Sequence, residues 1–187
     1  ETEAPEETAP PIDVPASCDQ TEPELSEPTV MAGEPEMQID PARTYTATIR
    51  TSCGDMVVAL DAANAPVGVN NFVALARAGF YDNTNFHRVV PDFVIQGGDP
   101  EGTGGGGPGY SVVTELPPDG YQTGELAWAK TQTDAPGTAG SQFFVVTGAE
   151  DGQGVGFLND TSSGSYLYGA FGMITEGLEV AQTIESL

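Results

Sequence analysis

Residues 86 to 99 read Phe86-His87-Arg88-Val89-Val90-Pro91-Asp92-Phe93-Val94-Ile95-Gln96-Gly97-Gly98-Asp99, and the rest of the chain is organised around them. β-Branched and aromatic residues on both sides of Pro91 suit a half-buried strand. Pro91 itself permits only an edge, a bulge or a kink, because it has no amide hydrogen to donate. The stretch therefore predicts a strand that bends at Pro91.

The side chains beyond this bend are expected to alternate between two faces. Phe93 and Ile95 fall on one face, and Val94 and Gln96 fall on the other. Arg88 precedes the bend, so either face is open to it. An arginine and a glutamine beside an apolar surface indicate a site for a neutral, partly apolar ligand.

The composition excludes several classes of partner. The 187 residues suffice for one domain with a sizeable core. The chain has 28 acidic and 5 basic residues and a formal net charge of −23, which disfavours nucleic acid and anionic membrane surfaces. There is no run of about 18 apolar residues, so no segment is predicted to span a bilayer.

The acidic charge is concentrated at the N-terminus. Residues 1–42 contain 12 acids and no Lys or Arg, and they are rich in Pro, Glu and Thr. Such a segment buries too little apolar surface to offset its ordering entropy, so it is predicted to be a disordered or extended tether. The chain is accordingly divided into an acidic tail, residues 1–42, and a folded domain, residues 43–187.

The first residue of the chain and its two cysteines indicate the cellular location of the protein. The first residue is Glu1 rather than Met, which suggests a processed start, with a signal segment or lipid anchor upstream. We therefore expect an extracellular or cell-surface bacterial protein; a salt-adapted cytosol is the alternative explanation of the charge. Cys18 and Cys53 are the only cysteines, and they are either free thiols or one disulfide that joins the tail to a strand end.

The remaining elements follow from alternation and turn residues. Residues 44–50 alternate, and the pattern resumes at 56–60 after a short turn, which predicts a β-hairpin. Pro66 opens a helical pattern that ends at Gly79. Further strands are predicted over 124–129, 141–147 and 166–174, and a short helix over 177–187.

Two glycine-rich stretches are interpreted as loops. Residues 102–109 lack the Gly-Lys-Ser/Thr sequence and the following helix of a phosphate loop. Residues 148–164 lack the spacing of an EF-hand calcium loop. We therefore predict no cofactor and no metal site.

Four motifs together resemble the cyclophilin family of peptidyl-prolyl cis-trans isomerases over about residues 44 to 184. They are Phe86-His87-Arg88 with Gln96-Gly97-Gly98-Asp99, Gly102-Thr103-Gly104-Gly105, Gly140-Ser141-Gln142-Phe143-Phe144, and Phe171-Gly172. The resemblance implies a closed eight-stranded antiparallel barrel capped by two helices, with a substrate groove on its outer surface. It also implies that proline-containing polypeptides are the substrates.

The resemblance implies a role for each motif residue. Arg88 is the natural donor to the amide nitrogen of a twisted Xaa-Pro bond, because it stays charged and has a rigid fork. Gln96 would position Arg88 and the substrate carbonyl. The proline pocket is assigned to Phe93, Val94, Phe144 and Leu158, and the groove lining to Gly102, Ala129, Lys130, Thr131 and Gln142. His87 is interpreted as structural, because the reaction moves no proton, and Trp128 is expected to pack inside the barrel.

Three groove positions depart from the family pattern. Lys130 stands where many members have Asn, Phe157 replaces a Trp of the pocket rim, and Tyr168 replaces a later His of that rim. Activity is expected to survive, because the catalytic residues Arg88, Gln96 and Phe93 are intact, as are Gln142 and Phe144. The change at Phe157 argues against tight binding of the family inhibitor cyclosporin.

The end of the chain raises a further expectation. The family has a last strand that pairs with the first, but this sequence stops at Leu187, so the closing strand is either truncated or missing. An open edge is a pairing site. We expect residues Thr29–Ile39, from the same or a neighbouring chain, to cover it, giving homo-assembly by strand addition. The alternative function is a non-catalytic peptide-binding or assembly module on the cell surface.

Overall fold

The computed structural model describes residues 18, 31–149, 153–160 and 167–187. The strands are β1 (Tyr45–Thr51), β2 (Gly54–Leu60), β3 (Arg88–Val90), β4 (Val94–Gly97), β5 (Val112–Val113), β6 (Glu125–Trp128), β7 (Thr138–Ala139), β8 (Phe143–Val146) and β9 (Ala170–Glu176). The helices are α1 (Pro66–Arg77), α2 (Gln153–Asn159) and α3 (Leu178–Glu185). None of them is long and apolar enough to cross a bilayer.

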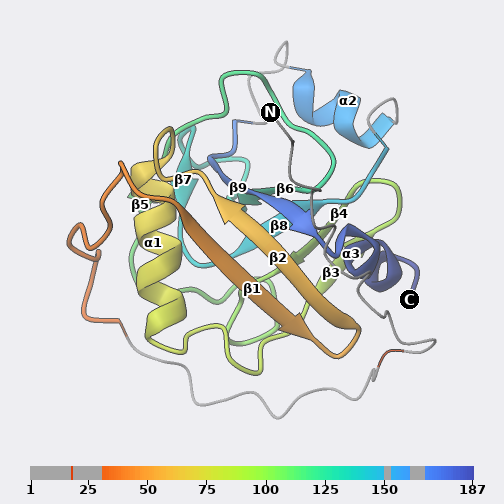
Figure 1. Ribbon diagram of the computed structural model, residues 1–187, viewed down its shortest axis with the longest axis horizontal. Coiled ribbons are helices and arrows are strands. Elements are labelled where there is room, and N and C mark those ends of the chain that lie inside the picture. The colour runs from red at the N-terminus through yellow and green to blue at the C-terminus, as the bar shows by residue number, and fades with distance from the viewer. Residues whose placement is uncertain (1–17, 19–30, 150–152, 161–166) are drawn as a thin grey trace, which may run out of the picture.

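Seven strands form one antiparallel sheet in the order β1-β2-β9-β6-β8-β4-β3. The β1–β2 hairpin lies in front of β6, β8 and β4 in Figure 1, so the sheet curls into a half-barrel around the core. β5 and β7 form a separate two-stranded sheet. The prediction of a mainly β fold is confirmed.

The first hairpin, the helices that begin at Pro66 and near residue 177, and the three later strands lie where the sequence predicted them. α1 begins with Pro66 in its first turn, where the missing amide hydrogen costs nothing. The carboxylate of Glu115 accepts hydrogen bonds from Val67 N (3.0 Å) and Gly68 N (3.2 Å), which satisfies two free donors of this helix end. The helix ends before Gly79, whose φ of 71° is the left-handed conformation that glycine adopts without strain.

The predicted single strand with a bend at Pro91 is wrong. Residues 91–93 form a turn, and β3 and β4 on either side of it pair antiparallel with Arg88 opposite Gln96. The reversal is possible because Asp92, at φ 56°, takes the left-handed conformation directly after Pro91. The short helix α2 and the two-residue strands β5 and β7 were not predicted.

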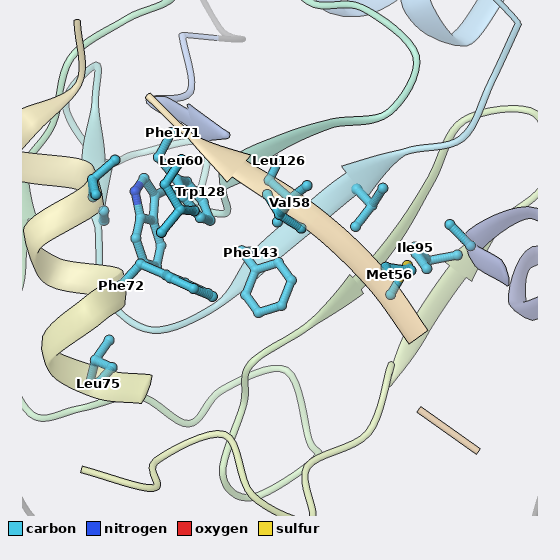
Figure 2. Packing of buried hydrophobic residues seen from close by; sticks show 14 of the residues in the cluster. Met56, Val58, Leu60, Phe72, Leu75, Ile95, Leu126, Trp128, Phe143 and Phe171 are labelled. Atoms are coloured by element: carbon cyan, nitrogen blue, oxygen red, sulfur yellow. The ribbon is translucent and has the colours of Figure 1, made fainter. Parts of the chain in front are cut away.

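Large aromatic side chains fill the space between the sheet and α1. Trp128 and Phe171 stack with ring centroids 4.5 Å apart, and Phe72 from α1 lies 5.1 Å from Phe171. Figure 2 shows these rings together with Phe143 and the aliphatic residues of β2. Trp128 and Phe171 have no solvent exposure, so the expectation that Trp128 packs inside is confirmed.

The sheet is open in the described part of the chain. There β1 pairs only with β2, and β3 pairs only with β4, so these two strands are its edges. The described residues thus form an open seven-stranded sheet with three helices. The sequence resemblance implies instead a closed barrel of eight strands with two helices. Both edges present backbone groups that a further strand could pair with.

Within the same chain, the described part of Thr29–Ile39, residues 31–39, does not pair with the β1 edge, so that alternative of the prediction is wrong. Pairing with this segment of a neighbouring chain stays a prediction. Residues 31–39 contain no strand. Instead, the Asn70 side chain of α1 donates to Glu36 O (3.1 Å) and accepts from Gln38 N (2.7 Å). Ile39 is buried in the core cluster. The Asn70 amide and the buried Ile39 side chain together hold residues 31–39 along α1.

Cys18 and Cys53 form a disulfide with a Cα–Cα distance of 4.5 Å. Cys53 lies in the turn between β1 and β2, so the bridge joins the acidic N-terminal segment to the first hairpin. Of the two alternatives that the sequence left open, the structure has the disulfide.

Reduction of this disulfide is expected to lower the free energy of unfolding. The bridge closes a loop with a sequence separation of 35 residues, and for such a loop the chain-entropy model gives a loss of about 4 kcal/mol. Urea unfolding with and without reductant measures the change. The double variant Cys18→Ser/Cys53→Ser is the control, and it should unfold at the same urea concentration in both conditions. An unchanged wild-type midpoint after complete reduction would contradict the expectation.

Candidate active site

One face of the sheet carries a row of functional side chains. Arg88 on β3 pairs with Gln96 on β4, Gln96 pairs with Phe144 on β8, and Phe144 pairs with Ala127 on β6. Residues directly opposite each other in neighbouring strands share a face. The row therefore lies on the face opposite Ile95, Val145 and Leu126, which belong to the core cluster.

The Arg88 side chain is exposed and is held by amides. Its Nη1 donates to Gln96 Oε1 at 3.3 Å. Gln96 Nε2 donates to Gln142 Oε1 (3.0 Å), and Gln142 Nε2 donates to the carbonyl oxygens of Gly104 (3.0 Å) and Gly106 (2.9 Å). The guanidinium is thus positioned by two glutamines anchored to the glycine-rich loop, and its remaining N–H groups are open to a ligand.

Asp99 holds the glycine-rich loop in place. It has no solvent exposure, and its carboxylate accepts hydrogen bonds from the backbone N–H groups of Glu101 (2.8 Å), Gly104 (2.5 Å) and Gly106 (3.2 Å). Burial raises its pKa, but these three bonds and the nearby His87 outweigh burial, so the pKa lies below its ordinary value. A side chain at Gly106 would run into this carboxylate. The loop carbonyls that anchor Gln142 depend on this arrangement.

An apolar cluster, in which the proline pocket is predicted, lies beside the row. The four residues assigned to the proline pocket, Phe93, Val94, Phe144 and Leu158, belong to one cluster that is separate from the main core. Val94, Phe144 and Leu158 are buried, while Phe93 is half-buried and stands edge-to-face with Phe157 at 6.0 Å. Phe157 is 47% exposed, so these two rings form the solvent-facing side of the cluster.

Phe93 lies on a different face from the one that alternation predicted. The pattern placed it with Ile95, but the structure packs it with Val94. The reason is that Phe93 belongs to the turn before β4, where the backbone does not alternate. Its N–H donates to Glu185 Oε1 of α3 (3.3 Å), and its carbonyl accepts from Thr147 N (2.9 Å). Both bonds hold the turn at the pocket.

Tyr168 forms another wall of the pocket. The hydroxyl of Tyr121 donates to Tyr168 O and accepts from Tyr168 N, both at 2.7 Å, so the backbone of Tyr168 is fixed. The Tyr168 ring lies edge-on to Phe144 at 5.1 Å. Asn159 at the end of α2 donates to Tyr121 O (2.9 Å) and accepts from Tyr121 N (2.7 Å), which ties α2 to the same wall.

His87, next to Arg88 in the chain, is a half-buried residue whose two ring nitrogens are shielded. Both imidazole nitrogens are shielded from solvent and have no hydrogen-bond partner among the described residues. Burial lowers the pKa of His87 from 6.5; Asp99 and Gln142 oppose this shift and Arg88 reinforces it. The ring is therefore neutral at pH 7, which agrees with a structural histidine.

We expect acid to destabilise the fold in two steps. The pKa of His87 is lower folded than unfolded, so its contribution is complete above pH 6.5 and is lost as the pH falls toward the folded-state value. The carboxyl of Asp99 also has a lowered pKa, so its contribution is lost below its ordinary value of 3.8. Urea unfolding between pH 8 and 3 measures both steps. His87→Gln should remove the upper step and keep the lower one; an upper step that survives this change has another source.

The comparisons with known proteins agree with this geometry. Residues 46–187 match the family model described as cyclophilin type peptidyl-prolyl cis-trans isomerase/CLD. The chain belongs to the cyclophilin-type peptidyl-prolyl cis-trans isomerase family. As a cyclophilin-type chain it is 45% identical over 106 residues to a peptidyl-prolyl cis-trans isomerase of Helicobacter pylori, a match that covers 56% of this chain and 63% of that relative. It is 43% identical over 124 residues to peptidyl-prolyl cis-trans isomerase B of Bacillus subtilis, covering 65% and 77%.

A solved structure shares the fold. The cyclophilin type peptidyl-prolyl cis-trans isomerase of Cryptosporidium parvum superposes with a TM-score of 0.64 and 33% identity, covering 76% of this chain and 85% of that one. A second structure of that protein, in the presence of the dipeptide Ala-Pro, has a TM-score of 0.62 and 34% identity and covers 75% and 85%. The match to the Helicobacter relative spans less than two thirds of that relative's length.

Most cyclophilin positions named from the sequence lie together. The backbone oxygen of Gln142 accepts a hydrogen bond from Ala129 N (2.9 Å). Ala129 packs against the cluster of Phe93, Val94, Phe144 and Leu158. Gly102 lies in the loop that Asp99 organises. Thr131 differs: it is exposed, and its Oγ1 is within 3.0 Å of Thr133 Oγ1 in a local turn, outside the pocket cluster.

Four positioning residues of this cyclophilin site were missed by sequence reasoning. They are Asp99, Tyr121, Asn159 and Glu185. Only Asp99 lay inside a recognised motif, which could have indicated a role. No group of three or more His, Cys, Asp or Glu side chains that could hold a metal occurs in the described ranges.

Proposed function

We propose that this chain catalyses the cis-trans isomerisation of Xaa-Pro bonds in polypeptides and so assists their folding. One observation carries the proposal: an exposed guanidinium, held by a glutamine amide, lies in the same cross-strand row as Phe144, an aromatic ring of a separate apolar cluster. Arg88 and Phe144 are two strands apart, or roughly 10 Å between backbones. An arginine side chain and a proline ring together can fill that span.

The reaction requires stabilisation of a twisted amide. Rotation about an Xaa-Pro bond has a barrier of about 18–20 kcal/mol and takes tens to hundreds of seconds unaided, because conjugation must be broken. In the twisted state the nitrogen lone pair is no longer delocalised and becomes a better hydrogen-bond acceptor. The guanidinium of Arg88 donates to it more strongly than to either planar isomer. This is catalysis by differential binding, without a nucleophile or a proton transfer.

The other residues have distinct roles in the proposal. The pocket of Phe93, Val94, Phe144 and Leu158 takes the proline ring. Ring burial stabilises both isomers and the twisted state equally, so by itself it does not raise kcat. Gln96 holds Arg88 and contacts the substrate carbonyl, and the backbone on either side of the proline lies along Gly102, Ala129, Lys130 and Gln142. Each 1.36 kcal/mol that Arg88 supplies only in the twisted state is tenfold in rate.

Exchange spectroscopy by NMR on a short Ala-Pro peptide tests the activity, since it needs no coupling protease. Catalytic amounts of the protein should bring cis-trans exchange into the observable range. The alternative is a binding module that kept the groove without useful turnover. Peptide chemical shifts that move on binding, with an exchange rate equal to that in buffer, would establish the module and refute the isomerase.

We infer further that the protein works outside the cytosol. The Cys18–Cys53 disulfide supports an oxidising compartment. The acidic N-terminal segment then serves as a tether between the folded domain and an anchor upstream. The β1 edge supports homo-assembly by strand addition, through which a strand of a second copy would complete the barrel. Light scattering over a range of protein concentrations tests the assembly, and a constant monomer mass would refute it.

A further inference from the structure

Lys130 places a positive charge at the wall of the pocket. It is the only lysine in the chain. Its ammonium nitrogen lies 5.4 Å from the centroid of the Tyr168 ring, which in turn packs edge-on against Phe144. A cation at this distance from an aromatic ring is attracted to it. The charge is thereby held beside the pocket by a ring whose own backbone is fixed by Tyr121.

No carboxylate oxygen lies within 4.0 Å of this ammonium among the described residues, although hydrogen bonds from Thr131 and, to a smaller extent, the charge of Lys130 lower the pKa of Asp134. Lys130 Nζ donates to the backbone oxygens of Thr131 (3.2 Å) and Asp134 (3.4 Å), both long bonds to neutral acceptors. The carboxylate of Asp134 instead accepts from Thr131 N at 2.8 Å. The one ion pair within 4.0 Å in the described ranges is Arg50 with Asp55. An ammonium has three donors, so Lys130 retains capacity for a ligand.

Arg88 is a second cation with no carboxylate within 4.0 Å among the described residues; it lies on β3, whereas Lys130 follows β6 on the other side of β8 and β4 in the sheet order. Arg43 and Arg77 also have no carboxylate within 4.0 Å in the part of the chain that the structure describes, so the lack of an ion pair does not by itself single out Lys130. What distinguishes Lys130 is its place on the Tyr168 wall. The groove therefore has positive charge on two sides, although the whole chain has a net charge of −23.

We propose that Lys130 selects Xaa-Pro segments that carry a carboxylate side chain, Glu or Asp, next to the proline. The proposal rests on the groove being the peptide site of the proposed isomerase. A carboxylate at the Tyr168 wall replaces the long contacts of Lys130 with a charge-assisted bond. For a pair that stays partly in water the expected preference is about three- to fivefold. It should weaken with salt, because the Debye length is about 8 Å at 0.15 M.

The net negative charge of the protein opposes this preference at long range. It repels an acidic peptide whether or not Lys130 is present. This long-range repulsion is nearly the same in wild type and in the residue 130 variants, so it cancels when the Glu-to-Gln peptide ratio is compared between them. What remains is the interaction of residue 130 with the peptide side chain, which disappears in Lys130→Gln and reverses its sign in Lys130→Glu.

The experiment measures binding and exchange for three peptide sets. Each set places Glu, Gln or Lys at one position: directly before the proline, two residues before it, or directly after it. NMR titration gives Kd, and exchange spectroscopy gives the catalysed rate, for wild type, Lys130→Gln and Lys130→Glu. Arg43→Gln is the matched control, since it removes one exposed positive charge outside the groove.

In wild type the Glu peptide should bind three- to fivefold more tightly than the Gln peptide in at least one set. Lys130→Gln should abolish that ratio, Lys130→Glu should favour the Lys peptide, and Arg43→Gln should behave as wild type. Equal Glu-to-Gln ratios in wild type and Lys130→Gln at all three positions overturn the proposal. Selective binding without faster exchange would instead keep the proposal and refute the isomerase.

Discussion

Replacing Arg88 with alanine is expected to lower kcat/KM for Xaa-Pro isomerisation by about 10²–10³-fold, the usual effect of removing one preorganised donor to a transition state. The side chain is exposed, and its one described hydrogen bond is the 3.3 Å contact with Gln96, so the free energy of unfolding should change by less than about 0.5 kcal/mol. Exchange spectroscopy and urea unfolding on the same samples measure the two quantities.

Two variants separate charge from geometry at this position. Arg88→Lys keeps the positive charge but loses the planar fork, so it should recover only part of the rate. Arg43→Ala removes an exposed arginine outside the groove and should leave kcat/KM unchanged. If Arg88→Ala retained the wild-type rate, the twisted amide would have to be stabilised by another group, and the proposed mechanism would be wrong.

The second large effect is expected from the adjacent rings Phe143 and Phe144, which face opposite sides of β8. Phe143 packs edge-on against Phe72 (6.0 Å), Tyr81 (5.7 Å) and Phe171 (6.3 Å) in the core. Phe143→Ala should therefore lower the free energy of unfolding by about 3–5 kcal/mol. The protein that remains folded should keep its kcat/KM.

Phe144→Ala should act on the substrate instead. Loss of the aromatic wall removes about 1.5–3 kcal/mol of apolar burial for the proline ring, so kcat/KM per folded molecule should fall about 10- to 100-fold, mainly through KM. Some stability will be lost as well, since Phe144 is buried. Both variants are compared at a temperature where circular dichroism shows them folded. Equal losses of kcat/KM in the two would mean that β8 does not separate core from groove.

The sequence predicted those parts of the fold that repeat along the chain. Alternation located β1 and β2, and the spacing of apolar residues located α1 and α3. Helix α2 was hidden because two of its seven residues, Gly154 and Gly156, weaken the helical pattern. β5 and β7 have two residues each, which is too short for any alternation to be recognised.

The site was predicted where motif residues lie on paired strands, and missed where distant segments meet. Arg88, Gln96 and Phe144 share a row because the register of three strands aligns them. The contact of Glu185 with Phe93 N spans 92 residues, and that of Asn159 with Tyr121 spans 38. Nothing local marks such pairs, because a single carboxylate or amide on a surface helix is most often solvated.

The Cys18–Cys53 bridge has a consequence for how the protein withstands proteolysis. A protease that cuts the backbone once anywhere between residues 19 and 52 would produce two fragments that remain covalently linked through sulfur. They would migrate as one band on a non-reducing gel and as two after addition of thiol. A single nick in this region therefore leaves the acidic segment covalently attached to the folded domain until the disulfide is reduced.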